Sequence, residues 1–187
     1  EIDLIQINTD ARNILEENNL FEEKKIKFRD RKEDICGDLV SMNTIINDDV
    51  DSIDADIYLM THTTNPLLSK DSIKKAILKY KDVLKKGQFD SLFTVNKIQD
   101  RFYSKDAVAL NHNPANLVRT QDLEPWYQEN SNLYLFTKDS FKKAKARIGK
   151  NPIMLETDPF ESIDIDTEYD WDLAEVMVEF YQKKGIL

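Results

Sequence analysis

The amino-acid sequence predicts an α/β fold, with a mostly parallel sheet covered by helices on both faces. Short apolar segments alternate with amphipathic helical segments along the 187 residues, which is typical of strand–helix–strand units. Residues 55–61 (ADIYLMT) are predominantly apolar and indicate a buried central strand. Polar loops follow several of the predicted strands, and ligands of such sheets bind at the carboxyl ends of strands.

In the first half of the chain we expect strands at 3–8, 26–28 and 55–61, and helices at 9–18, 39–46 and 70–86. Apolar residues recur at helical spacing through 70–86, which indicates that one face of this helix packs inward. Ser69 stands at its N-cap position and Gly87 follows its end, as helix boundaries prefer.

In the second half we expect strands at 91–95, 133–136, 153–156 and 162–165, and helices at 139–147 and 168–184. The polar stretch 96–130 predicts a loop or an excursion from the sheet. Thr167, followed three residues later by Asp170, predicts a capping box at the start of the last helix.

Composition excludes several classes of protein. The formal net charge of −9 argues against a nucleic-acid backbone or an anionic membrane as the main partner. Cys36 is the only cysteine, so no internal disulfide forms, and a reducing cytoplasm fits. No apolar run approaches the roughly 18 residues of a transmembrane helix. We therefore expect a cytoplasmic protein of one domain.

Asp164 and Asp166 are the most informative pair of residues. In a strand, side chains two positions apart leave the same face, so the two carboxylates would lie side by side and repel each other. A divalent cation relieves this repulsion, and oxygen ligands favour Mg²⁺. The alternative is a solvated strand end that carries two surface aspartates.

Two polar loops are further candidates for a binding site. The loop 62–67 (HTTNPL) follows the strand 55–61 and precedes a helix N-terminus, where free backbone N–H groups favour polar ligands. The stretch 119–131 is rich in groups suited to sugars and carboxylates. Arg101 and Arg147 are additional cations that could face an anionic substrate. The alternatives are ordinary proline turns and surface salt bridges.

Taken together, these segments resemble the acylneuraminate cytidylyltransferase family, the CMP-sialic acid synthetases and their relatives. The resemblance covers essentially the whole chain, and the segment 162–167 (SIDIDT) matches the metal-binding motif of the family without change. The other segments that carry it, in order, are Asn8-Thr9-Asp10, Arg31 with 37–41 (GDLVS), 62–67 (HTTNPL) and 130–134 (NSNLY).

The resemblance implies a Rossmann-like nucleotide-diphospho-sugar transferase fold and a homodimer. It implies a reaction in which CTP and a 2-keto sugar acid give a CMP-sugar and pyrophosphate, with Mg²⁺ held by the catalytic residues Asp164 and Asp166. The nucleotide would be bound by Asp10, Arg31, Ser41 and Asn43. The sugar acid would be bound by His62, Thr63, Thr64, Asn65, Arg101, Arg119, Gln121 and Asn130.

The sequence departs from the family at three places. The opening strand and the Gly/Ser/Lys-rich phosphate loop of the family are not found, so we expect a single domain over 1–187 that lacks both. His62 replaces the usual glutamine, and Ser131-Asn132 replaces Gly-Ala. These departures leave two alternatives to a sialic-acid-like substrate. One is a different acceptor, such as another sugar acid or a phosphonate, and the other is a non-catalytic sugar- or nucleotide-binding relative.

Overall fold

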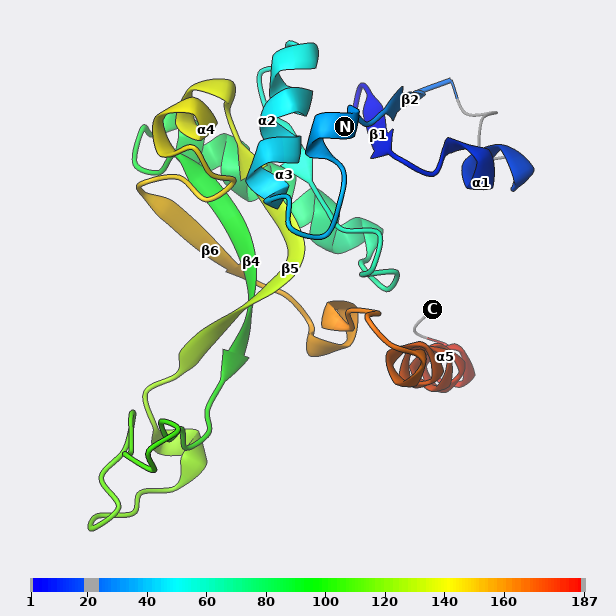
Figure 1. The fold of residues 1–187 in the computed structure, drawn as a ribbon. Helices are drawn as coiled ribbons and strands as arrows, with labels where there is room; N and C mark the ends of the chain where they lie inside the picture. The colour runs from blue at the N-terminus through cyan, green and yellow to red at the C-terminus, as the bar shows by residue number, and fades with distance from the viewer. Residues whose placement is uncertain (1, 19–23, 186–187) are drawn as a thin grey trace.

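The computed structural model describes residues 2–18 and 24–185, and Figure 1 shows its elements in order. Strands β1 (Ile5–Thr9) and β2 (Ile26–Asp30) form a two-stranded parallel sheet. A second sheet has the order β3-β5-β4-β6, with β3 (Tyr58–Met60), β4 (Ser91–Ile98), β5 (Trp126–Phe136) and β6 (Pro152–Glu156). The helices are α1 (Arg12–Glu17), α2 (Met42–Ser52), α3 (Lys70–Lys85), α4 (Lys138–Ala144) and α5 (Glu168–Lys183).

The four-stranded sheet is mixed, because β5 runs antiparallel to both of its neighbours, β3 and β4. β4 pairs with β6 in parallel, so three of the four strands run in one direction. The α/β class is confirmed, with β5 as the exception to the parallel arrangement. β3 is short and lies at the edge of this sheet, so the prediction of a central strand at 55–61 is wrong. Apolar composition alone cannot identify an edge strand, because it does not show which strands pair.

Helices cover both faces of the four-stranded sheet, as predicted. On one face, Ala76 and Tyr80 of α3 pack with Leu133 and Leu135 of β5. On the opposite face, residues from α2 and α4 pack with Tyr134 and other residues of the sheet. Consecutive residues of β5 thus point to opposite cores, as the two-residue period of a strand requires.

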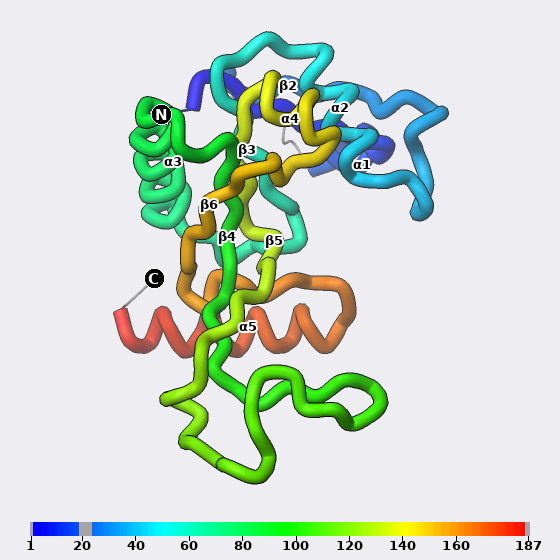
Figure 2. The backbone as a smooth tube through the Cα atoms, turned by 90° about the vertical axis from the view of Figure 1, so that its left-hand side faces the viewer, coloured from blue at the N-terminus to red at the C-terminus, as the bar shows by residue number. Residues whose placement is uncertain are grey.

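The pairing of β4 with β5 is interrupted by a bulge. Phe93 pairs with Tyr134 and Val95 pairs with Glu129, so residues 130–133 lie opposite Thr94 alone. Beyond the bulge the two strands continue as a ribbon, which ends in a projecting arm of residues 99–125 (Figures 1 and 2). The excursion predicted for 96–130 is therefore smaller, since strand pairing extends to Ile98 and resumes at Trp126.

The strand predicted at 162–165 is absent. Pro159–Ser162 forms a 3-10 helix, and residues 163–165 are in no strand. β6 pairs with β4 only as far as Glu156, so the later residues lie beyond the end of β6.

The predicted starts of two helices are confirmed, whereas the helix predicted at 9–18 begins only at Arg12, because Thr9 belongs to β1, and the helix predicted at 139–147 ends at Ala144. Ser69 accepts a hydrogen bond from the backbone of α3, and Thr167 and Asp170 form the capping box of α5. The helix predicted at 39–46 is displaced, because Ser41 caps α2 and the helix extends to Ser52. None of the helices in the described parts of the chain has both the length and the apolar character of a membrane span.

Candidate functional site

The Asp164 segment lies between the 3-10 helix and α5. Oδ1 of Asp164 is buried and has no hydrogen-bond partner among the described residues. Asp166 is exposed, and its backbone N–H donates to Oδ2 of Asp170 at 3.3 Å. The hydroxyl of Thr167, then the N–H groups of Thr167 and Asp166, lower the pKa of Asp170 by hydrogen bonding. The two candidate metal ligands thus precede a well-capped helix, one of them with an unsatisfied buried oxygen.

The loop 62–67 lies directly beside this segment. The backbone N–H of Ile165 donates to the carbonyl of Thr64 at 2.8 Å. The side-chain amide of Asn65 donates to the carbonyl of Ile163 at 3.3 Å. Asn65 is 4% exposed, and its Oδ1 is a second buried oxygen without a partner in the described part of the chain. The structure thus brings two segments that are about a hundred residues apart in sequence together, and both carry orphaned oxygen atoms.

The donor set fits Mg²⁺ better than a metal held entirely by protein ligands. Within residues 2–18 and 24–185, no group of three or more His, Cys, Asp or Glu side chains is arranged to hold an ion. Mg²⁺ is commonly held by one or two carboxylates, with water and substrate phosphates as its other ligands. The orphaned oxygen of Asp164 fits such a ligand, because a buried carboxylate oxygen without a donor or cation is unfavourable.

A second cluster surrounds His62, which follows β3. Nη1 of Arg147 lies 2.9 Å from Nε2 of His62, and Nη2 of Arg147 lies 3.1 Å from Oε1 of Glu129. The guanidinium carbon of Arg147 lies 3.9 Å from the centre of the Tyr134 ring, a cation–π geometry. The phenol of Tyr134 donates to the same Glu129 oxygen. The cluster therefore joins β3, β5 and the loop after α4 at one point.

The electrostatic environment favours the neutral form of His62. Burial is the main cause that lowers the pKa of His62, and the charge of Arg147 lowers it further. The carboxylates of Asp164 and Glu129 act in the opposite direction. Burial, together with the hydrogen bond to Glu129, raises the pKa of Tyr134 to about 12. His62 and Tyr134 are therefore both uncharged near pH 7.

The sequence assigns no specific role to Glu129, Tyr134 or Arg147. Glu129 lies in the candidate stretch 119–131, Tyr134 ends the segment 130–134, and Arg147 is one of two additional candidate cations. No spacing in the sequence relates Arg147 to His62, which lies 85 residues away. Only the position of the loop after α4 shows the contact.

Asn130 is buried, with 7% of its surface exposed. Its amide nitrogen lies 2.9, 2.7 and 3.1 Å from acceptor oxygens of Asn96, Thr157 and Ser162, which share its two N–H donors. Because the bulge turns Asn130 inward, its amide holds the 3-10 helix against β4 and β5, just before the Asp164 segment. In this structure Asn130 thus positions the end of the 3-10 helix, which leads into the Asp164 segment.

The residues expected to bind the nucleotide lie in two places. Arg31 donates to Oδ1 and to the carbonyl oxygen of Asn8, and pairs with Asp10 at 3.6 Å, so the structure brings Arg31 and Asp10 together. Ser41 caps α2. Asn43 accepts a hydrogen bond from the backbone N–H of Arg147 at 3.1 Å, and so links the start of α2 to the His62 cluster.

The three arm residues expected to bind the sugar acid form their hydrogen bonds and ion pairs within the arm or at its base. Arg101 donates to the carbonyl of Val118, and Arg119 pairs with Asp122 at 2.7 Å. The carbonyl of Gln121 accepts from Gln99. Of the remaining expected residues, Thr63 is exposed and Thr64 is half-buried in the loop beside Asp164.

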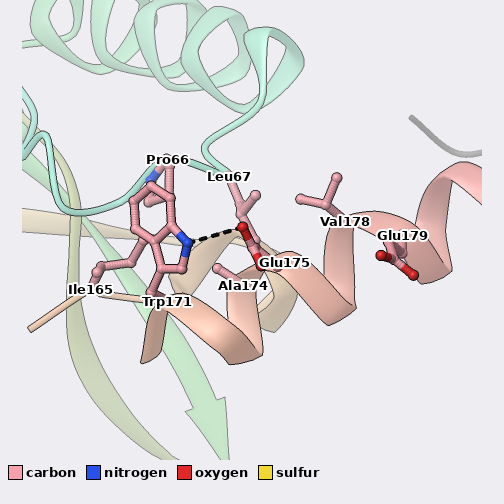
Figure 3. A pocket seen from close by; sticks show the side chains of 8 residues that line it. All are labelled: Pro66, Leu67, Ile165, Trp171, Ala174, Glu175, Val178 and Glu179. Carbon is pink, nitrogen blue, oxygen red and sulfur yellow. Dashed lines mark hydrogen bonds between the residues drawn. The ribbon is translucent and has the colours of Figure 1, made fainter. Parts of the chain in front are cut away.

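An apolar cleft of about 410 Å³ lies between this loop and α5. Figure 3 shows Trp171 against Pro66, with its indole N–H directed at Glu175 at 3.0 Å. The remaining lining residues are Leu67, Ile165, Ala174, Val178 and Glu179. Ile165 lines this cleft and lies between the two candidate metal ligands in sequence, so the cleft adjoins the Asp164 segment.

Comparison with known proteins identifies the family. A family model described as cytidylyltransferase matches residues 1–186. No curated protein sequence matches this chain. Solved structures are similar in fold at low identity. The 4-diphosphocytidyl-2C-methyl-D-erythritol synthase of Anaerococcus prevotii has a TM-score of 0.67 at 13% identity, covering 95% of this chain and 79% of that chain.

Two further structures have the same fold. The 2-C-methyl-D-erythritol 4-phosphate cytidylyltransferase of Francisella tularensis has a TM-score of 0.62 at 16% identity, covering 94% of this chain and 80% of that chain. A CMP:2-keto-3-deoxy-manno-octonic acid synthetase, solved with CTP, has a TM-score of 0.58 at 12% identity, covering 96% and 81%. These similarities confirm the Rossmann-like nucleotidyltransferase fold. With its whole described length inside the matched region, the chain belongs to the cytidylyltransferase family.

Proposed function

We propose that this protein transfers the cytidylyl group of CTP to a 2-keto sugar acid of the sialic-acid type, with Mg²⁺ as cofactor. The observation that carries the proposal is the orphaned oxygen of Asp164, which lies two residues from the exposed carboxylate of Asp166. The family membership supports the use of CTP, and one structural relative is named as a synthetase of a CMP-linked 2-keto sugar acid. The SIDIDT segment also matches, without change, the metal-binding motif of the acylneuraminate family that the sequence resembles.

In this mechanism the anomeric hydroxyl of the sugar acid attacks the α-phosphorus of CTP in line and gives up its proton to solvent, while the bond from the α-phosphorus to the α–β bridging oxygen breaks and pyrophosphate leaves. Asp164 and Asp166 would hold the Mg²⁺, which when bound neutralises phosphate charge and polarises the attacking hydroxyl. The loop of His62, Thr63, Thr64 and Asn65 would orient the acceptor beside these carboxylates, because hydrogen bonds join it to the Asp164 segment.

The nucleotide would be bound by Arg31, Asp10, Ser41 and Asn43. Arg31 is held by Asn8 and Asp10, so its guanidinium is oriented before any ligand binds. In the complete protein, Arg31→Ala should raise the Kd for CTP at least tenfold, which corresponds to one charge-assisted hydrogen bond. Isothermal titration with CTP measures this, and an unchanged Kd would remove Arg31 from the nucleotide site.

We further propose that the arm meets a second copy of the chain. Arg101, Arg119 and Gln121 would then complete the sugar-acid site of the partner subunit. Large apolar side chains in solvent are unfavourable and typical of a surface that another protein covers. Those exposed on the arm and at its base are Tyr103, Val108, Leu110, Leu117, Val118, Trp126 and Tyr127.

The deciding experiment is pyrophosphate release by the complete protein with CTP, Mg²⁺ and a panel of 2-keto sugar acids. Release that requires Mg²⁺ and one acid would establish the reaction and its acceptor. Release with a different acceptor, such as a phosphonate or a polyol phosphate, would keep the cytidylyltransferase activity and replace the sugar acid. Binding of CTP without release for any acceptor would favour a non-catalytic relative.

A further inference from the structure

We propose that Arg147 is a positioning residue that fixes His62 in the neutral tautomer with its proton on Nδ1. His62 then donates a hydrogen bond to an oxygen of the acceptor, and does not act as the general base. This inference rests on the proposed function and names the part of the site that reads the acceptor.

The tautomer follows from the chemistry of the contact. Arginine carries five N–H donors, has no acceptor and stays protonated in proteins. Its Nη1 lies 2.9 Å from Nε2 of His62, so Nε2 must offer a lone pair to this contact. A neutral imidazole has one proton, and that proton is therefore on Nδ1. The lone pair that a general base would need is already engaged.

Arg147 is held in this position by three other contacts. Glu129 accepts from Nη2 at 3.1 Å, the Tyr134 ring lies beneath the guanidinium at 3.9 Å, and Asn43 accepts from the Arg147 backbone. The Arg147 side chain is only 20% exposed. The guanidinium is therefore preorganised, and His62 cannot turn Nε2 into a donor without losing this contact.

The charged groups around His62 agree with a neutral ring. Arg147 opposes protonation, whereas Asp164 and Glu129 favour it, and the edge contact with the Tyr134 ring is uncharged. Burial and Arg147 together outweigh the two carboxylates. The tautomer, however, is determined by the Arg147 contact alone.

The Nδ1 atom is available to a ligand. It has no hydrogen-bond partner in the described parts of the chain, and it is not among the buried atoms that lack one, so it is not fully buried. The residues after His62 are hydrogen-bonded to the Asp164 segment at Thr64 and Asn65. An N–H donor at this place suits a carboxylate, keto or hydroxyl oxygen of the acceptor.

Nitrogen-15 NMR of the imidazole tests the tautomer directly. The 187-residue chain has two histidines, so His112→Gln in the ¹⁵N-histidine-labelled protein leaves one imidazole, whose two ring nitrogens each give a signal. At pH 7 we expect a protonated Nδ1 and an unprotonated Nε2. A proton on Nε2 would overturn the proposal, and this measurement needs neither substrate nor turnover.

Arg147→Met tests whether Arg147 fixes the tautomer of His62. We expect a mixture of tautomers and a higher pKa of His62, since a neighbouring cation is removed. Lys150→Met is the matched control, because it removes an exposed cation three residues away and should leave the Nδ1–H tautomer intact. An unchanged tautomer in Arg147→Met would show that Arg147 does not fix it. If that variant does not fold, the spectrum of the parent protein still decides the tautomer.

Kinetics then test the donor role. A glutamine amide also offers an N–H donor, so His62→Gln should keep a kcat/KM about tenfold higher than His62→Leu, the worth of one hydrogen bond to a polar ligand. Equal losses in both variants would contradict the donor role. If no acid supports turnover in the parent protein, the proposed function fails, and the NMR result still stands or falls separately.

Discussion

The orphaned carboxylate oxygen of Asp164 predicts a conflict between stability and metal binding. In the absence of Mg²⁺, this buried oxygen has neither a donor nor a cation among the described residues. Leaving a buried polar group unsatisfied costs about 1–3 kcal/mol. Because the rest of the Asp164 side chain is half-buried, we use the lower limit, so Asp164→Ala should stabilise the Mg²⁺-free protein by about 1 kcal/mol.

The same substitution should remove the response to the metal. A ligand present at a hundred times its Kd stabilises a folded protein by about 2.7 kcal/mol. Mg²⁺ with CTP should therefore stabilise the parent protein by an amount of this order, and Asp164→Ala by much less. The expected outcome is a variant that is more stable without Mg²⁺ and less stable than the parent with saturating Mg²⁺ and CTP.

Urea unfolding in EDTA, in MgCl₂, and in MgCl₂ with CTP measures the free energy of unfolding without metal, with Mg²⁺, and with Mg²⁺ and CTP. Asp166→Ala is the matched control, because Asp166 is exposed and has no orphaned oxygen. It should change the stability without Mg²⁺ by less than about 0.5 kcal/mol, as surface substitutions usually do, and still weaken the metal response. A loss of stability in Mg²⁺-free Asp164→Ala would refute the reasoning, as would an undiminished response to Mg²⁺ and CTP.

Three further predictions concern the surroundings of the site. A methyl group at Gly149 would lie 2.2 Å from Oδ1 of Asp90, whose carboxylate is held in place by the backbone N–H groups of Lys150 and Asn151. Gly149→Ala should therefore lower the free energy of unfolding in urea by about 1–3 kcal/mol. Lys150→Ala is the control, and equal stabilities of the two variants would contradict the contact. Asn130→Ala should cost about 2 kcal/mol and lower the affinity for Mg²⁺, since the two N–H donors shared by Asn96, Thr157 and Ser162 are lost. An unchanged affinity would separate this network from the metal segment. The lowered pKa of His62 means that the unfolded chain binds more protons just below pH 6.5, so this contribution to stability is complete above about pH 6.5 and is lost as the pH falls toward the folded pKa. His62→Gln should therefore flatten the acid side of the stability–pH curve, and a curve of unchanged slope would count against a buried neutral His62.

Several elements could be predicted because their signals are local. The capping residues Ser69 and Thr167 act on N–H groups within three residues, so the start of α3 and of α5 follows from the sequence. The apolar spacing of residues 70–86 predicts which face of α3 is buried, and Tyr80 and Ala76 are indeed fully buried.

Other features depend on partners distant in sequence. Residues 162–165 have strand-like composition, yet no strand lies beside them, so they form a 3-10 turn and an extended segment. The position of β3 at a sheet edge, and the bulge that buries Asn130, likewise depend on which strands pair.

The sequence by itself determined the α/β class, the family resemblance, the starts of α3 and α5 and the pair Asp164 and Asp166, since these depend on composition, spacing and short motifs. Only the tertiary structure decided that Arg147 binds His62, and that the loop after β3 lies against the Asp164 segment. The physical reason is that each of these contacts joins residues some 85 to 100 positions apart. The order of the strands and the path of the loops bring them together, and neither is encoded within any one segment.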